Sequence, residues 1–329
     1  MLNRKLALPV AGLLAGVLLA GCGSSDDSDD KNTVKVAISA KLEAFAPLLV
    51  GMELGSYADQ DLDVEIVTAA PSDAMVLLAT GEVDAVFSAP SAAFFNAVSG
   101  GSPIKIVAPG MFPPENSRSG LWVSKDLAPG GTFDPEKLRG ETVATAVGAG
   151  APVSMVLEEE LERSGVSAED VKFQTMGATD ILVALESGAV KAGWLSDPVW
   201  LEAEKSDDLT FAFGQPEDIT MGAVLFGPTL LEKDRDKGAR LLAGMRSAVA
   251  DHLQGAYHDD PEVRAALIEQ LEISEDQLDK LPELVFPPDL AYPAGLTDRY
   301  QATYARQKGV LVYSDPLPED EVIDADLAK

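Results

Sequence analysis

Histidine and cysteine are scarce in this chain, which has two histidines and one cysteine among its 329 residues. A single cysteine excludes an intramolecular disulfide bond. So few imidazoles and thiols also argue against a His/Cys metal site and against a Ser-His-Asp hydrolase. We therefore expect neither a bound metal nor a cofactor.

Basic residues are also few, since 25 Lys and Arg stand against 54 Asp and Glu, which gives a formal net charge of −29. A polyanion of this kind releases no counterions from phosphates, so we expect no nucleic-acid partner. The hydrophobic fraction of 46% and the charged fraction of 24% are ordinary for a globular protein. The length is typical of two domains.

The N-terminus carries a basic segment, Met1 to Lys5, followed by an apolar run of 15 residues from Leu6 to Ala20. The run is shorter than the ~20 residues that span a bilayer, and it is typical of a secretory signal. The sequence Leu19-Ala20-Gly21-Cys22 resembles the lipobox of bacterial lipoproteins. The resemblance implies a signal peptide over residues 1–21 and a diacylglyceryl thioether on Cys22. The alternative is a buried structural cysteine beside an ordinary helix.

Acidic stretches flank the part of the chain that is patterned as a globular domain. Residues 22–32 include the run Ser24 to Asp30, which has nothing to bury, so we interpret them as a lipidated acidic tether. About eight residues of such coil reach ~15 Å. Residues 316–329 form a second acidic, proline-containing stretch, which we expect to be a loosely held tail.

Short β-rich runs alternate with helical runs from Thr33 onward, beginning with a strand from Val34 to Ser39 and a helix from Pro47 to Leu54. Strands separated by helices of this length predict βαβ crossovers and a mainly parallel sheet. Pro/Gly-punctuated segments near 111–120 and 214–222 predict two crossings between lobes. We therefore predict a lobe 1 made of residues 33–112 plus 220–315 and a lobe 2 made of residues 113–219.

The two predicted lobes contain a matching segment. Residues Asp73 to Ala85 align without gaps to residues Asp180 to Ala192 at an offset of 107. Six residue identities coincide, and Gly81 and Gly188 fall where a helix would stop. A structural repeat is the interpretation that we favour. The alternative is coincidence among residues that every βαβ unit uses.

The predicted fold places a ligand cleft between the lobes. In open α/β sheets, ligands bind beyond the carboxyl ends of the strands, and two facing lobes close by hinge motion. The loops that would line the cleft hold no histidine or cysteine, and their carboxylates, on Glu43, Asp73 and Asp197, are scattered. We interpret His252 and His258 as exposed polar positions near a helix end. We therefore predict a binding site rather than a catalytic site.

Several residues of these loops offer groups that could bind a small solute. The turn from Gly148 to Ser154 leads into a helix, where free N–H groups could hold a carboxylate, a sulfonate or nitrate; the alternative is a plain tight turn. Trp194 could stack on a planar ligand or pack in the core. Asp197 could cap the following helix or accept a hydrogen bond from a ligand amine. The candidate ligand-binding set is Lys41, Phe45, Ser72, Ser88, Pro90, Ser91, Phe112, Gly150, Ser154, Trp194 and Asp197.

A long part of the chain resembles a known family. From Thr33 to about Leu281 the sequence is similar to the solute-binding proteins of ABC importers for nitrate, sulfonates, taurine and thiamine-pyrimidine precursors. The segments that carry the resemblance are Val34 to Ser39, Leu62 to Val67, Ala79 to Phe87, Leu138 to Ala144 and Trp194 to Pro198. The resemblance implies the α/β fold of a type II periplasmic binding protein, with two lobes, a hinge and an interlobe cleft.

The function implied by the resemblance is that of a lipid-anchored, monomeric receptor on the extracytoplasmic face of the cell membrane. It would capture a small solute and deliver it to the permease subunits of an ABC importer. The loops hold no arginine except Arg118 at the hinge, so an aromatic or amine-bearing solute would use Trp194 and Asp197 more directly than a small anion would. The alternatives are an enzyme on the same scaffold, like the pyrimidine-precursor synthases, and a sensor or adhesion lipoprotein with a vestigial cleft.

Overall fold

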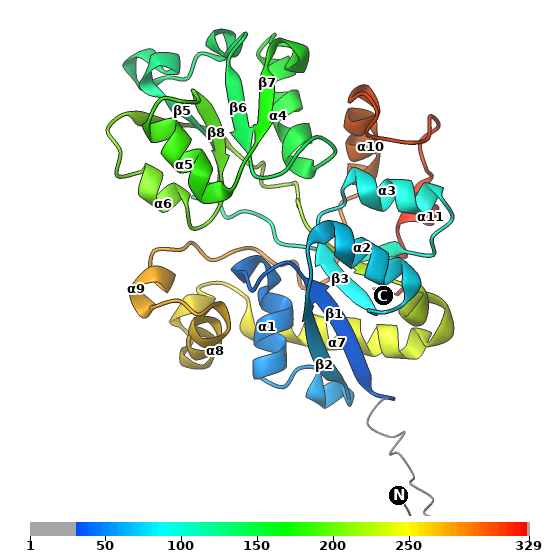
Figure 1. Cartoon of the computed structure of the whole chain (residues 1–329). Coiled ribbons are helices and arrows are strands. Elements are labelled where there is room, and N and C mark those ends of the chain that lie inside the picture. The colour runs from blue at the N-terminus through cyan, green and yellow to red at the C-terminus, as the bar shows by residue number, and fades with distance from the viewer. Residues whose placement is uncertain (1–30, 328–329) are drawn as a thin grey trace, which may run out of the picture. The chain divides into compact units, whose positions relative to one another are not determined.

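Two five-stranded sheets form the framework of the described chain, one in each of two lobes (Figure 1). The structure is a computed structural model that describes residues 31–327, so the predicted signal peptide and Cys22 lie outside the described residues. The sheet of lobe 1 has the strand order β2-β1-β3-β10-β4, and that of lobe 2 has the order β7-β6-β8-β5-β9. This arrangement confirms the predicted α/β class and its two lobes.

The strands are short and rich in β-branched or small apolar residues, which favour a pleated, buried surface. Their bounds in lobe 1 are β1 (Thr33–Ile38), β2 (Asp63–Thr68), β3 (Ala85–Ser88), β4 (Lys105–Pro109) and β10 (Ala223–Phe226). In lobe 2 the bounds are β5 (Gly120–Ser124), β6 (Thr142–Thr145), β7 (Lys172–Thr175), β8 (Ala192–Leu195) and β9 (Leu209–Gly214). The central strands β8 and β10 are buried along their whole length, as helices on both faces of a sheet require.

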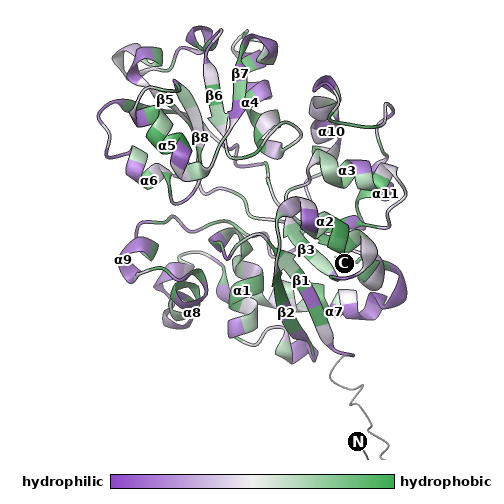
Figure 2. Ribbon diagram, in the orientation of Figure 1, coloured by the Kyte–Doolittle hydropathy of each residue, from purple (hydrophilic) through white to green (hydrophobic). Residues whose placement is uncertain are grey.

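Helices connect the strands and cover the sheets. The α-helices are α1 (Ala46–Glu53), α2 (Pro71–Thr80), α3 (Ala92–Ser99), α4 (Pro152–Arg163), α5 (Ala178–Glu186), α6 (Trp200–Ala203), α7 (Arg235–His252), α8 (Pro261–Leu271), α9 (Glu275–Leu278), α10 (Leu296–Arg306) and α11 (Glu319–Val322). The 3₁₀-helices are η1 (Glu43–Phe45), η2 (Ala58–Gln60), η3 (Lys125–Leu127), η4 (Pro129–Gly131), η5 (Pro135–Leu138), η6 (Ala168–Asp170) and η8 (Tyr257–Asp259). The segment η7 (Thr229–Lys233) is a π-helix. The strands are mainly hydrophobic, while the outer helices α8 and α9 carry hydrophilic residues (Figure 2).

The internal repeat predicted from the sequence is present in the structure. In lobe 1, β1 pairs in parallel with β2 and with β3. In lobe 2, β6 pairs in parallel with β7 and with β8 in the same way. An antiparallel strand completes the match: β10 lies beside β3 in lobe 1, and β5 lies beside β8 in lobe 2. Gly81 and Gly188 have φ angles of 76° and 72°, a left-handed conformation that ends a helix and favours glycine, so the predicted helix stops are confirmed.

The chain passes between the lobes twice, once between β4 and β5 and once between β9 and β10. The two passages lie against each other, because the N–H of Gly110 donates to the carbonyl of Gly222 at 2.9 Å. A Cβ atom on Gly110 would come within 2.8 Å of the Gly222 Cα, so this close approach requires a residue without a side chain. Paired backbone without side chains between the lobes has the character of a hinge.

Helix α10 joins the two lobes on one side of the molecule. The hydroxyl of Tyr304 donates to the carbonyl of Pro90, which precedes α3 of lobe 1, at 3.2 Å. On lobe 2, the Arg299 guanidinium makes two hydrogen bonds to Glu159 of α4, at 2.7 and 3.2 Å. One apolar cluster includes Phe95 of lobe 1, Met155 of lobe 2 and Tyr304 of α10, so the hydrophobic core is continuous between the lobes on this side.

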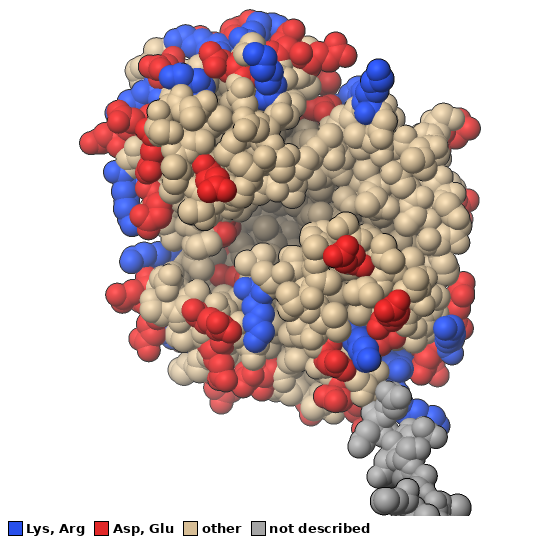
Figure 3. All heavy atoms as spheres, viewed as in Figure 1, with Lys and Arg blue, Asp and Glu red and all other residues tan. Residues whose placement is uncertain are grey.

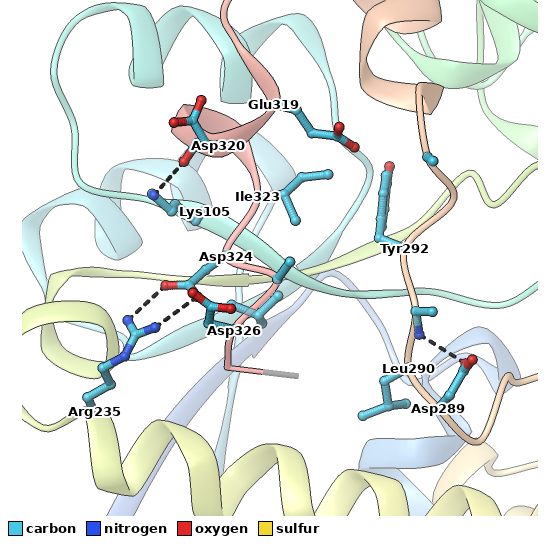
Figure 4. A pocket seen from close by; sticks show the side chains of 14 residues that line it. Lys105, Arg235, Asp289, Leu290, Tyr292, Glu319, Asp320, Ile323, Asp324 and Asp326 are labelled. Carbon is cyan, nitrogen blue, oxygen red and sulfur yellow. Dashed lines mark hydrogen bonds and ion pairs between the residues drawn. The ribbon is translucent and has the colours of Figure 1, made fainter. Parts of the chain in front are cut away.

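The acidic stretch after residue 316 is packed, and the expectation of a loosely held tail is wrong for the described part. Val322 of α11 is fully buried, and Ile323 forms a parallel bridge with Ile106 of β4. The Arg235 guanidinium donates to both carboxylate oxygens of Asp324, at 2.8 and 2.9 Å (Figure 4). Two apolar side chains placed among acids, together with a bidentate ion pair, explain why this stretch folds onto lobe 1.

A cavity of about 870 Å³ lies beside this C-terminal segment in lobe 1. Its two basic residues are Lys105 and Arg235, and both are engaged by the segment itself (Figure 4). The Lys105 ammonium donates to the carbonyl of Asp320 at 2.7 Å. The cavity is therefore a gap between the segment and the lobe that it covers.

Replacing Val322 with Ala should lower the free energy of unfolding by about 2 kcal/mol, because it leaves a cavity in packed apolar surroundings. Val312→Ala is the matched control, because Val312 is 76% exposed whereas Val322 is 0% exposed. The control should change stability by less than about 0.5 kcal/mol. Urea unfolding of both variants measures the difference, and equal effects would show that the segment contributes no packing.

Candidate functional site

The carboxyl ends of parallel strands from both lobes face each other across a recess. The loop after β1 borders the recess from lobe 1, and the loop after β8 borders it from lobe 2 (Figures 1 and 3). In the space-filling view the walls of the recess are mainly uncharged (Figure 3). Ligands of open α/β sheets bind beyond the carboxyl ends of the strands, so this cleft is the candidate functional site.

Lobe 1 contributes a buried carboxylate to the cleft loops. Glu43 lies in η1, directly after β1, and only 9% of the residue is exposed. Its Oε1 accepts a hydrogen bond from the Tyr257 hydroxyl at 2.6 Å and lies 2.7 Å from Nε2 of His258. Burial and the adjacent Glu43 carboxylate raise the pKa of Tyr257 well above its ordinary value, so the hydroxyl stays protonated as a donor. Glu43 is thus held in one orientation by residues from a distant segment.

Lobe 2 contributes a second carboxylate. Asp197 lies in the loop between β8 and α6, and it accepts a hydrogen bond from the indole N–H of Trp200. Burial raises the pKa of Asp197, the bond from Trp200 opposes the shift, and the charge of Glu43 raises the pKa further. The charge of Glu43 therefore acts on Asp197, although the two residues belong to different lobes. The predicted alternative that Asp197 caps α6 is not seen, because α6 has no side-chain cap.

The predicted anion-binding turn before α4 is already occupied by the protein. The N–H of Gly150 donates to Oε1 of Gln307 at 2.6 Å, and the carbonyl of Gly150 accepts from the N–H of Ala92 at 2.8 Å. The Ser154 hydroxyl donates to the carbonyl of Ala151 and accepts from Nε2 of Gln307. Gly150 and Ser154 therefore serve the contact between α10, α3 and α4, and the expectation of free N–H groups at Gly150 is wrong.

Aromatic side chains contribute less to the cleft than the sequence suggested. Trp194 is 4% exposed and packs edge-on against Phe213, with ring centroids 6.5 Å apart, so it is a core residue and not a stacking wall. Phe45 is half-buried and meets Phe87 edge-on at 6.1 Å. Phe112 is half-buried and forms an isolated antiparallel bridge with Val285. Phe45, in the same turn as Glu43, is the aromatic candidate nearest to the carboxylates in sequence.

The remaining candidates are distributed around the loops of lobe 1. Lys41 and Ser72 are exposed, and Ser88 and Ser91 are half-buried. Pro90 is buried under Tyr304. Among residues 31–327, the side chain that hydrogen-bonds to Asp197 is that of Trp200, which belongs to lobe 2. The same residues contain no group of three or more His, Cys, Asp or Glu arranged to hold a metal ion.

Sequence reasoning missed the groups that hold Glu43. His258 is 5% exposed and bound to Glu43, so its interpretation as an exposed polar position is wrong. Tyr257 and His258 follow Glu43 by 214 and 215 residues, and no local spacing links such distant positions. The sequence does indicate Glu43 as a carboxylate in a cleft loop, because it is a charged residue that closely follows a predicted strand.

Replacing Asp197 with Asn should stabilise the ligand-free protein at neutral pH. The raised pKa means that the ionised carboxylate destabilises the fold above that pKa, and protonation relieves this cost as the pH falls. We expect the free energy of unfolding to rise by about 1 kcal/mol at pH 7, with a gain that shrinks as the pH falls through the raised pKa.

Urea unfolding at several pH values measures this difference. Asp236→Asn makes the same chemical change on an exposed residue of α7 and should have little effect. A loss of stability in Asp197→Asn at neutral pH would mean that the bond from Trp200 outweighs the cost of the buried charge.

Solved structures with this architecture include three binding proteins. The periplasmic aliphatic sulphonate binding protein SsuA from Escherichia coli has a TM-score of 0.65 and 16% identity, covering 89% of this chain and 97% of that chain. The alkanesulfonate-binding protein SsuA from Xanthomonas axonopodis, bound to MOPS, has a TM-score of 0.65 and 16% identity, covering 88% and 98%. The periplasmic nitrate-binding protein NrtA from Synechocystis has a TM-score of 0.68 and 15% identity, covering 90% and 87%. At these identities the likeness shows the fold, that of a periplasmic binding protein.

The sequence itself gives one family match. No curated protein sequence matches significantly. Within residues 31–327, no helix has the length and apolar character that a membrane span requires. Residues 43–250, more than half of the chain, match the family described as NMT1/THI5 like. The protein therefore belongs to the NMT1/THI5-like family.

Proposed function

We propose that this protein is the extracytoplasmic solute-binding component of an ABC importer. It captures a small organic solute in the cleft between lobes 1 and 2 and delivers it to permease subunits. It works as a monomer that is anchored by lipid at Cys22. The pairing of two lobes, with loops from β1 and β8 meeting at one recess, is the observation that carries the proposal (Figure 3).

The relatives support a role in transport. The solved structures with the same fold include proteins that bind aliphatic sulphonates, alkanesulfonates and nitrate. A further neighbour is the ligand-binding component of an ABC-type import system from Staphylococcus aureus, with a TM-score of 0.64 and 15% identity. Binding followed by release to a membrane partner needs no catalytic group, only a cleft that opens and closes.

Closure follows from how the lobes are connected. Helix α10 and the continuous apolar cluster hold the lobes together on one side. The glycine pair Gly110 and Gly222 joins them through backbone alone. A solute that contacts both lobes favours the closed state in proportion to its differential contacts. A shift from 1:99 to 99:1 needs about 5.5 kcal/mol of such contacts.

An enzyme on this scaffold is the weaker reading of the same cleft. The family resemblance implies that pyrimidine-precursor synthases share this fold, and that such an enzyme needs a reactive histidine and a reactive lysine in the cleft. Here the Nε2 of His258 is bound to Glu43, and Lys41 is exposed. The arrangement positions a carboxylate and leaves no activated nucleophile among the cleft loops that the structure describes.

The proposed binding function predicts ligand-dependent stabilisation of the purified protein. A solute at about 100 times its dissociation constant adds about 2.7 kcal/mol, which raises the melting temperature by several degrees. The panel consists of nitrate, taurine, alkanesulfonates, aminopyrimidines, flavins, polyamines and aromatic acids. X-ray scattering of any stabilised sample should show a smaller radius of gyration, as lobe closure requires. Stabilisation without compaction would contradict capture by closure.

The proposed anchor predicts the behaviour of Cys22→Ser. Only the thiol accepts the diacylglyceryl group, and two or more acyl chains are needed for stable anchoring. We expect the wild type to sediment with membranes and Cys22→Ser to lose that attachment, with both proteins unfolding at the same urea concentration. Membrane sedimentation and intact-mass analysis test this. A membrane-bound wild type that keeps a free Cys22 thiol would contradict the proposal.

A further inference from the structure

We propose that the exposed faces of α2 and α5 form a two-part docking surface for a pair of like permease subunits, each of which offers an apolar pocket beside a basic side chain. This inference rests on the proposed function, because it names the surface that meets the partner. Helix α2 packs against β3 of lobe 1 and α5 packs against β8 of lobe 2, so each lobe would contact one subunit.

Each of the two helices exposes one large apolar side chain. Val76 of α2 is 61% exposed, and Val183 of α5 is 58% exposed. Their numbers differ by 107, the offset of the internal repeat, so the two valines hold the same position in the two lobes. A single exposed apolar residue is ordinary on a protein surface, but the fold itself gives no reason for the same one in both halves of the repeat.

Around each valine the exposed surface has the same chemistry. Asp73, Val76 and Thr80 lie at positions i, i+3 and i+7 of α2, so they form one outward stripe. The equivalent three positions of lobe 2 are also exposed, and they carry Asp180, Val183 and Ser187. Carboxylate, isopropyl group and hydroxyl therefore recur in the same order on both lobes.

The buried faces of the two helices match less closely than these exposed stripes. Two of the three buried positions of α2, Ala74 and Met75, correspond to Ile181 and Leu182 in α5. Packing against the sheets therefore tolerates different side chains at these positions, while the stripes keep their chemistry outside the core. A requirement that comes from outside the chain, and that acts alike on both lobes, accounts for this difference.

Each exposed valine has a carboxylate about one turn before it. Asp73 and Asp180 are exposed, and within residues 31–327 neither forms an ion pair or a side-chain hydrogen bond. A basic side chain of a partner beside each valine would supply the counter-charge, and such complementarity sets specificity and association rate. The same carboxylates disfavour an anionic lipid surface, and they disfavour a second copy of this chain, whose stripes carry the same sign.

The two helices lie on either side of the recess between the lobes. Figure 1 shows α2 and α5 in front of the sheets of their lobes, and the recess of Figure 3 opens between them on the same side. A partner that binds both stripes spans the recess, so it stands where a solute leaves when the lobes open. Two equivalent stripes fit two like subunits, because each subunit then meets the same chemistry.

Photo-crosslinking in cells of the organism that produces this protein tests the inference. Val76→Cys and Val183→Cys are each labelled with benzophenone maleimide, which cannot attach to Cys22 when lipid blocks its sulfur. We expect each variant to form an adduct with an integral membrane protein that mass spectrometry identifies as an ABC permease subunit. The double variant should join two such subunits. Val312→Cys is the matched control without an adduct, because Val312 is 76% exposed and lies outside the repeat.

Charge reversal tests the carboxylates separately from the valines. Asp73→Lys and Asp180→Lys, each made in the cysteine variant of the same helix, should lower the adduct yield about tenfold, because they place like charges together. Asp236→Lys should leave the yield unchanged, and it is a matched control because Asp236 is exposed and also lies in the first turn of its helix, α7. Urea unfolding checks that the variants remain folded.

The outcomes separate this inference from the proposed function. Adducts with a second copy of this chain in place of a permease overturn the docking surface, as do permease adducts that form equally well from Val312→Cys. Absence of permease adducts at Val76 and Val183 also overturns it. In these cases the proposed function stands if a compound of the panel named above still raises the melting temperature. If no compound of that panel stabilises the wild type and no permease adduct forms, the proposed function fails as well.

Discussion

The joining of the lobes by α10 is the constraint on which the rest of the structure depends. Tyr304 reaches lobe 1 and Arg299 reaches lobe 2, while the helix shares one apolar cluster with both. A hydrophobic contact of this extent is worth far more than any single surface ion pair. It fixes one edge of the molecule, and the recess between the carboxyl ends of β1 and β8 is consequently the edge that remains free to change shape (Figure 3).

The two carboxylates of the cleft loops, on Glu43 and Asp197, are held by hydrogen bonds from other side chains. A buried carboxylate is costly unless hydrogen bonds hold it, and Glu43 receives them from Tyr257 and His258. Asp197 receives one from Trp200 and keeps a raised pKa. A residue that costs stability where the fold does not require it is most simply understood as serving binding. Binding thus favours keeping carboxylates at positions where the stability of the fold would favour uncharged residues.

The fold was predictable from local pattern, and the site only in part. Alternating strands and helices, Gly81 and Gly188 as helix stops, and the 107-residue offset all express local rules, so they were visible in the sequence. The bond of His258 to Glu43 is made across 215 residues and obeys no local rule. The same reason explains the errors at Gly150, whose N–H is taken by Gln307 across 157 residues. Position after a strand indicates a site, but tertiary partners decide which groups there stay free.

The position of β10 in the sheet of lobe 1 constrains the order in which the chain folds. β10 lies between β3 and β4 and is paired antiparallel with both, although all of lobe 2 precedes it in the chain. Lobe 1 therefore cannot complete its sheet while the chain emerges in order, since β3 and β4 have no common neighbour until residue 223 is available. Lobe 2 is the unit that can assemble first, and closing lobe 1 over so long a loop is the slow, non-local step. A chain interrupted before β10 would present two unpaired strand edges, the feature most prone to aggregation.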